Sequence, residues 1–342
     1  MSRNRGRIDR QPKPTLKTIA QLTGLAPATV SRALNDADDI SSSTKERVRL
    51  AARQIGYRPD RAGFRLRTGK SRVIALVLNM EDEILGIAGP LVNGVAEVLS
   101  RSGYGMVVVP DSPHEDPLKA VGEVLDSGMA DGLIITRTQP MDQRVIFLTN
   151  EEFPFVTFGR TQLRSVHASV DFDNETFAYE SVRRLADNGR RNIALLAPPS
   201  HLMFCKHMSD GFRRGIRDFG CVEVPFGNVD LDSPLEDIFN EGTRWPFESG
   251  LVDGFVAGSA STGVALLAGL ESVGARIKVD FDMVAKEPTR FTEWIRPEII
   301  AINEDIRAAG NELARTIISV ASGTELASLQ LLIAPKFRDA SV

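Results

Sequence analysis

The sequence predicts a small basic helical module followed by a larger acidic α/β core of two similar lobes, and three observations carry this prediction. Residues 1–72 hold 17 lysines and arginines against 6 aspartates and glutamates, a balance of +11, whereas residues 73–342 hold 24 against 39. From Val73 onward, short apolar runs alternate with stretches of helical periodicity, which is typical of parallel sheets with helices on both faces. The 342 residues, 42% of them hydrophobic, suffice for two or three domains.

The first helices of the basic module are marked by their boundary residues. Residues 1–14 are rich in arginine and proline and offer little to bury, so we expect a disordered arm there. Thr15 is expected to N-cap a first helix that ends at Gly24, because glycine accepts the left-handed backbone of a tight turn. Pro27 suits the first position of a second helix, where its missing N–H costs nothing.

A third helix is expected to start with a capping box formed by Ser43 and Glu46 and to end at Gly56. Three short helices with a glycine turn between the first two indicate a helix-turn-helix domain, which we assign to residues 15–59. The outward face of the second helix is small and polar enough to enter the DNA major groove, and Arg32 can reach guanine O6 and N7. A helical hairpin that contacts another protein is the alternative, which the positive charge disfavours.

Three stretches resemble the headpiece and hinge of the lactose-repressor family of bacterial transcriptional regulators: "TLKTIAQLTGLAPATVSRALN", "STKERVRLAARQIGYRPDRA" and "LRTGKS". The resemblance covers essentially the whole chain and implies a two-lobed, effector-binding core like that of the periplasmic binding proteins. It also implies that Pro27 and Ala28 select the operator sequence, with supporting contacts from Thr29, Ser31 and Arg32. Further DNA contacts are expected at Thr15, Asn35 and Tyr57.

Residues 60–72 are expected to form a hinge between the module and the core. A helix over this segment cannot hold alone, because it is short and contains Gly63, so we expect coil in the free protein and helix on DNA. Arg61 would contact phosphates or the minor groove. The resemblance implies that Leu66 is the hinge leucine that wedges between base pairs. A flexible linker is the alternative interpretation.

The core, residues 73–342, is expected to contain seven strands with helices between them. The strands are expected at 73–79, 105–110, 132–136, 155–159, 192–197, 254–258 and 281–286. The helices are expected near 89–101, 116–127, 174–188, 206–219 and 262–273. Because the strands fall into two groups along the chain, the sequence predicts two lobes with a cleft between them.

Ligands of such folds bind beyond the carboxyl ends of the strands, so polar and aromatic residues at strand ends are the candidates for effector contacts. Charged and amide side chains can bind adjacent sugar hydroxyls, and an aromatic ring can lie against the sugar face. In the family pattern, the acidic residue after the late strand falls on Glu287. The candidates are Asn79, Asp82, Thr136, Arg137, Arg160, Phe204, His207 and Glu287.

Several classes of function find no support in the sequence. The four histidines have no metal-ligand spacing, the two cysteines form no CxxC motif, and no GxGxxG or GxSxG motif occurs at a suitable place, so we expect no metal, no cofactor and no catalysis. No apolar run approaches about 18 residues, and the N-terminus lacks an apolar signal core. We therefore expect a cytoplasmic protein without membrane contact.

The preferred hypothesis is a homodimeric repressor of a carbohydrate-utilisation operon. It would bind a pseudo-palindromic double-stranded operator, because one helix-turn-helix reads only a half-site. A small effector, a mono- or disaccharide such as an α-glucoside, would control that binding. A sugar- or nucleotide-processing enzyme on the same two-lobed fold is the alternative. A solute-binding protein for import is a third hypothesis, which the lack of an export signal disfavours.

Overall fold

The structure is a computed structural model that describes residues 14–34, 36–57, 65, 69–79, 86–112, 115–248 and 252–337. The chain divides into two compact units, Met1–Ser71 and Arg72–Val342. In the described ranges no helix is long and apolar enough to cross a membrane.

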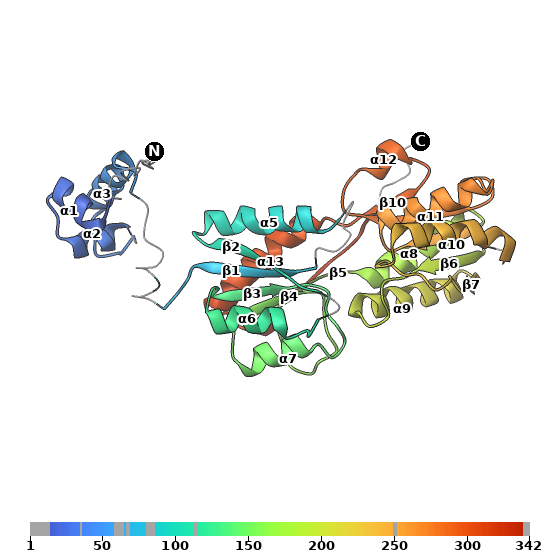
Figure 1. The fold of residues 1–342 in the computed structure, drawn as a ribbon, viewed down its shortest axis with the longest axis horizontal. Coiled ribbons are helices and arrows are strands. Elements are labelled where there is room, and N and C mark those ends of the chain that lie inside the picture. Colours follow the sequence, from blue (N-terminus) through green and yellow to red (C-terminus); the bar gives the residue numbers. More distant parts are fainter. Residues whose placement is uncertain are drawn as a thin grey trace, which may run out of the picture. The chain divides into compact units, whose positions relative to one another are not determined.

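In its described residues, the N-terminal unit contains three short helices packed around a small apolar core (Figure 1). They are α1 (Leu16–Thr23), α2 (Pro27–Leu34) and α3 (Ser42–Gln54). Ile19, Val30 and Val48, one from each helix, are fully buried at the centre. Thr15 caps α1 as predicted, in a reciprocal capping box with Thr18, and Gly24 ends α1 at φ 67°. The predicted first position of Pro27 in α2 is confirmed.

The start of α3 differs from the prediction. Ser41, not Ser43, is the N-cap, and its hydroxyl oxygen accepts a hydrogen bond from the Thr44 N–H at 3.3 Å. The expected box of Ser43 and Glu46 is therefore wrong. The physical reason is that Ser41 has the extended backbone of a cap, whereas Ser43 is already inside the first helical turn. Gly56 follows the helix with φ 64°, which agrees with its expected role at the end.

The first lobe of the core is a six-stranded parallel sheet in the order β11-β5-β4-β3-β1-β2. Its helices α5 and α13 cover one face and α6 and α7 the other (Figure 1). The strands are β1 (Val73–Leu78), β2 (Gly105–Pro110), β3 (Gly132–Ile135), β4 (Phe155–Phe158), β5 (Ser169–Phe172) and β11 (Gln330–Ile333). The helices are α5 (Ala88–Arg101), α6 (Lys119–Ser127), α7 (Gln143–Asn150) and α13 (Ile306–Ala321).

The second lobe has the order β12-β10-β9-β8-β6-β7, with only β12 antiparallel to its neighbour. Helices α8 and α9 cover one face, and α10 and α11 the other. The strands are β6 (Asn192–Leu196), β7 (Val222–Val224), β8 (Gly254–Ala257), β9 (Asp282–Glu287), β10 (Ile300–Asn303) and β12 (Lys336–Phe337). The other elements are α8 (Asn174–Asp187), α9 (Met203–Asp218), α10 (Leu235–Glu248), α11 (Ala260–Ser272), α12 (Thr292–Ile295) and the 3-10 helix η1 (Leu326–Ser328).

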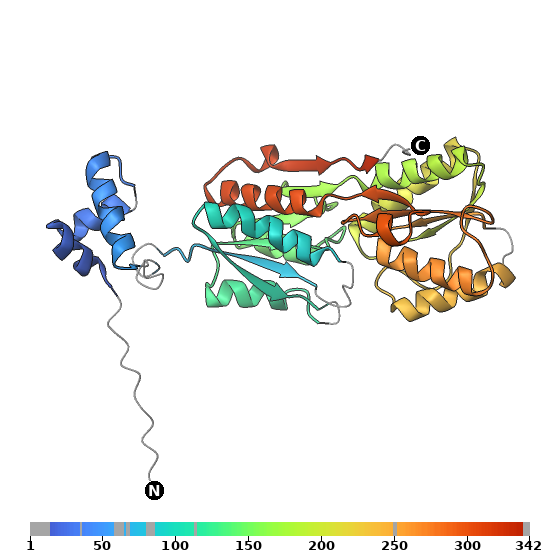
Figure 2. The ribbon, with the colours of Figure 1, turned by 90° about the horizontal axis from the view of Figure 1, so that it is seen from above.

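The chain passes between the two lobes three times. It leaves the first lobe after β5, returns after β10 to form α13, and crosses again between β11 and β12. Figure 2 shows the last passage as the red segment that runs from the first lobe to the second. Asp173 and Asp305 cap α8 and α13 directly after the first two crossings. The first lobe is therefore discontinuous in sequence.

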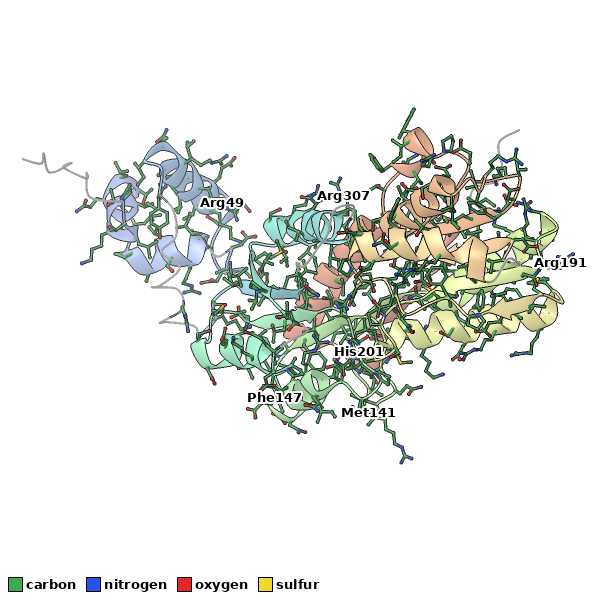
Figure 3. The ribbon with its side chains drawn as sticks, turned by 45° about the vertical axis from the view of Figure 1, so that its right-hand side comes forward. Arg49, Met141, Phe147, Arg191, His201 and Arg307 are labelled. Carbon is green, nitrogen blue, oxygen red and sulfur yellow. The ribbon has the colours of Figure 1, made fainter. Side chains whose placement is uncertain are left out.

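Glycines allow the covering helices to lie very close together. A Cβ on Gly94 of α5 would lie 2.2 Å from the carbonyl oxygen of Arg307, and one on Gly310 of α13 would lie 2.7 Å from the carbonyl oxygen of Leu91. Arg307 of α13 lies beside α5 (Figure 3). Its Nη2 donates to Glu97 of α5 at 3.0 Å. Backbone contact of this kind makes a larger residue at either glycine destabilising.

All seven expected strands and all five expected core helices are present, with small shifts at their ends. Strands β5, β7, β10, β11 and β12 and helices α7, α10, α12 and α13 were not predicted. Helix α9 begins at Met203, so Phe204 and His207 lie on this helix. The expectation that both residues precede the helix is therefore wrong. The expected disordered arm falls almost entirely, and the expected hinge helix mainly, outside the described residues.

Candidate nucleic-acid interface and ligand cavity

The face of α2 that points away from the helical core carries the predicted groove-reading residues. Pro27, Ala28 and Arg32 are exposed, and Thr29 and Ser31 are half-buried. This division follows from the helical period, because Val30 and Ala33 point inward and are fully buried. The sequence therefore presents a face of small and polar side chains with one arginine at its C-terminal end.

Arg32 is not free on this face. Its Nη2 donates to the Asp39 carboxylate in the loop after α2, and the Arg32 and Asp39 side chains are 58% and 51% exposed. The same loop is held to α3 at Asp36, where Arg49 donates to Oδ1 at 2.7 Å and Lys45 donates to the carbonyl oxygen at 3.1 Å. The hydrogen bond and the charge of Lys45 lower the pKa of Asp36. Neither aspartate contact was predicted.

The remaining predicted DNA contacts divide into two groups. Thr15 is exposed at the start of α1, and Tyr57 is half-buried after α3, against the helical core. Asn35, Arg61 and Leu66 lie outside the described residues, as does the cavity candidate Asp82.

A cavity of about 810 Å³ lies between the two lobes of the core, beyond the carboxyl ends of the strands, where the sequence predicts it. Of the predicted ligand contacts, Asn79, Thr136, Arg137 and Phe204 line it. Phe158, Phe172 and Phe204 supply aromatic rings, and hydroxyl groups come from both lobes. Figure 3 shows His201, another lining residue, at the boundary between the lobes.

Arg137 reaches across the cavity and is held by a buried arginine behind it. Its guanidinium donates to both carboxylate oxygens of Asp232 in the second lobe, at 3.1 Å from Nη1 to Oδ1. Arg137 adopts φ 56°, an unusual backbone for a residue with a side chain. Arg144 stabilises that loop, because its Nη2 donates to the carbonyl oxygens of Thr136 and Arg137 at 3.0 and 3.1 Å. Asp142 and Asp111 balance the buried Arg144 charge.

Lys286 lies at the wall of the cavity where two of the interlobe crossings meet. It is 5% exposed and donates to Glu304 and to the Asn174 side chain, both at 3.0 Å. Its Nζ is also 5.2 Å from the ring centre of Phe172 and 5.6 Å from that of Phe204. The sequence reasoning missed Lys286 as a site residue, although a lysine that ends an apolar strand run was a usable signal.

Arg160 and His207 meet beside the cavity but are not on its wall. Arg160 Nε donates to Asp171 at 2.7 Å, and its Nη2 donates to His207 Nδ1 at 3.4 Å, which also links the two lobes. Burial and the neighbouring Arg160 charge lower the pKa of His207. Asp171, which was not predicted, is the member of this cluster that lines the cavity.

Glu287 differs most from its expected role. It is the last residue of β9, not a residue after the strand, and it is 1% exposed. Its carboxylate accepts from the Thr292 N–H at 2.8 Å and from the Thr292 hydroxyl, and it is not on the cavity wall. Side chains alternate along a strand, so Lys286 faces the cavity and Glu287 is turned toward α12.

Two family models match the chain. "Bacterial regulatory proteins, lacI family" matches residues 15–60, and "Periplasmic binding proteins and sugar binding domain of LacI family" matches residues 89–239. The HTH-type transcriptional regulator CelR of Thermobifida fusca is 27% identical over 339 residues, which are 95% of this chain and 97% of that protein.

Solved structures share the whole fold. The transcriptional regulator CelR–cellobiose complex has a TM-score of 0.70 at 24% identity and covers 96% of this chain and 99% of its own. The lac repressor dimer bound to operator and the anti-inducer ONPF has a TM-score of 0.78 at 20% identity and covers 96% and 98%. With a helix-turn-helix module, a two-lobed core and both family models matched in order, the chain belongs to the lacI family of bacterial transcriptional regulators.

Proposed function

We propose that this regulator represses genes of carbohydrate utilisation and that an uncharged mono- or disaccharide, bound in the interlobe cavity, controls its affinity for DNA. The observation that carries the sugar assignment is the chemistry of the cavity wall. Among the described residues that line it, five are carboxylates and two are cations. The carboxylates are Asp171, Asp230, Asp232, Glu236 and Glu304.

The charge balance of the cavity favours a neutral ligand over a sugar phosphate. Arg137 is paired with Asp232, and Lys286 with Glu304, so both cations already have partners. A phosphate group would meet an excess of negative charge, which costs binding free energy. Sugar hydroxyls, in contrast, donate well to carboxylates, and three phenylalanine rings can lie against sugar faces.

The relatives support the same ligand class. The CelR structure that shares this fold holds cellobiose, a neutral disaccharide. The cavity volume of about 810 Å³ is within the range for organic ligands of this size or larger. A glucose-containing disaccharide, either a β-glucoside or an α-glucoside, is therefore the first class to test.

We also propose that the protein acts as a homodimer in the cytoplasm and is not an enzyme. One helix-turn-helix module reads a half-site, and the related lac repressor is a dimer on its operator. Phe291, Trp294 and Ile295, on and beside α12, are exposed by 41%, 81% and 45%, and a second copy of the chain would cover such an apolar surface. Both family models describe regulators or binding domains, which supports a function without catalysis.

The test combines ligand binding with DNA binding. Full-length protein first selects its preferred duplex from a randomised library. Cellobiose, maltose and glucose 6-phosphate are then compared for their effect on melting temperature and on affinity for that duplex. A disaccharide at 100 times its Kd is expected to stabilise the core by about 2.7 kcal/mol and to change DNA affinity. Stabilisation by glucose 6-phosphate alone would contradict the neutral ligand, and unchanged DNA affinity would contradict sugar control.

Two substitutions localise the binding site. Phe204→Leu removes an aromatic ring from the cavity wall and is expected to weaken disaccharide binding by about 1 kcal/mol. Glu287→Gln is the matched control, because Glu287 lies beside the cavity but off its wall. If titration calorimetry finds that Glu287→Gln loses more disaccharide affinity than Phe204→Leu, the ligand does not bind against the Phe204 ring.

A further inference from the structure

We infer that Asp39 is a specificity-determining residue of the DNA interface, which positions Arg32 toward base edges and away from phosphates. The inference rests on the proposed function, since it takes the exposed face of α2 as the face that reads DNA. The carboxylate of Asp39 places a negative charge on a surface that must approach the polyanionic DNA.

The contact between the two side chains sets the direction of the Arg32 guanidinium. Nη2 of Arg32 donates to Asp39, and both side chains are more than half exposed, so the pair stands on the surface and not in the helical core. A guanidinium has five N–H donors in a fixed fork. The bond to Asp39 leaves enough of them to donate to guanine O6 and N7 at the same time.

The loop after α2 carries three aspartates, at positions 36, 38 and 39, and they differ in what they contact. Asp36 is bound by Lys45 and Arg49 of α3, which gives it a structural role. Asp39 is bound by Arg32, the arginine of the exposed α2 face. No hydrogen bond or ion pair joins Asp38 to another residue of the described ranges. Asp38 is thus a natural control for the effect of charge alone.

A carboxylate beside Arg32 changes which DNA groups that arginine can bind well. Phosphate oxygens carry negative charge and are repelled by Asp39, whereas the guanine edge offers neutral acceptors. Arg32 therefore loses more affinity for phosphates than for guanine when Asp39 is present. Non-specific binding depends on phosphates and specific binding on base edges, so Asp39 raises the ratio between the two affinities.

The test measures that ratio for full-length protein with two probes, the duplex selected from a randomised library and a scrambled duplex of equal length. Asp38→Asn and Asp39→Asn each remove one negative charge and should strengthen binding to the scrambled duplex. Only Asp39→Asn should also lower the ratio of selected to scrambled affinity, by about 1.5- to 5-fold relative to Asp38→Asn. Asp39→Glu keeps the carboxylate and should restore the ratio.

A second background ties the effect to Arg32. In Arg32→Ala protein, Asp39→Asn and Asp38→Asn should change the ratio equally, because the contact is gone. The inference is overturned if the two asparagine variants have equal ratios in the parent protein, or if the Asp39 effect persists without Arg32. If Arg32→Ala alone leaves the ratio unchanged, base reading by Arg32 fails, and the inference fails with it. Circular dichroism of each variant checks that the helices remain folded.

Discussion

His207 combines burial with a cationic neighbour, and both act on its protonation. Its side chain is 12% exposed, it accepts from Arg160, and Asp171 lies 3.7 Å from its Nδ1. Burial and Arg160 disfavour the imidazolium, and their sum exceeds the opposing effect of Asp171, so the pKa of His207 lies below 6.5 in the folded protein. Below about pH 6.5 the imidazole of His207 is therefore protonated more readily in the unfolded chain than in the folded chain.

We predict that the core loses stability as the pH falls through about 6.5 toward the folded-state pKa of His207. His207→Gln removes this titration and should make the melting temperature less dependent on pH in that range. Arg160→Gln should raise the pKa of His207, as read by NMR titration of its ring protons, because a nearby positive charge is lost. A pKa that falls in Arg160→Gln would contradict this account.

Sequence reasoning located part of the cavity and missed the rest for a physical reason. Thr136 and Arg137 follow the apolar strand β3 directly, so the rule that ligands bind at strand ends applies to them. Asp232 lies in a long connection between β7 and α10, where no apolar run marks its position. The burial of Asp171 inside β5 depends on its pairing with Arg160, a contact that only the fold creates.

At the level of elements, strands with continuous apolar runs were predictable and short or polar ones were not. β1 and β8 are buried along almost their whole length and read as apolar runs. β5 contains Ser169 and Asp171, and β7 is only three residues long and largely exposed. β11 and β12 are edge strands at the far end of the chain, and their partners are set by the crossings between lobes.

Helix α5 offers a matched pair of glycines that tests the close packing against α13. Gly94→Ala would place a methyl group 2.2 Å from a backbone oxygen of α13, whereas nothing lies within 4 Å of a Cβ at Gly89. We predict that Gly94→Ala lowers the free energy of unfolding by about 1–3 kcal/mol. Gly89→Ala should change it by less than about 1 kcal/mol, with stabilisation expected. Equal effects of the two substitutions in denaturant titrations would rule out the packing explanation.

At the level of the whole core, the pair of Arg137 and Asp232 joins the lobes across the ligand cavity. The two side chains are 26% and 38% exposed, so the pair is screened by solvent, and we assign it about 0.2–1 kcal/mol. Such a contact holds the two lobes together across the cavity. It therefore contributes to the balance between lobe positions in the ligand-free protein.

Charge reversal tests this balance. We predict that Asp232→Arg increases the radius of gyration of ligand-free protein in X-ray scattering, because two like charges then face each other across the cavity. The double variant Arg137→Asp with Asp232→Arg restores an opposite pair and should recover the parent value. Unchanged scattering from the single variant would show that the pair has no part in closure.

The triple passage of the chain between the lobes fixes an order of events during synthesis. The face of the first sheet that holds α5 also requires Ile306, Leu313 and Ile317 of α13, which are translated near the end of the message. The second lobe needs only residues 174–304 and the short edge strand β12. At about 5–20 residues per second, roughly 7–30 s pass between the synthesis of β5 and that of the covering helix α13. The apolar face of the lobe that is translated first therefore stays open to chaperones until α13 is made, whereas by residue 304 the second lobe lacks only a two-residue edge strand.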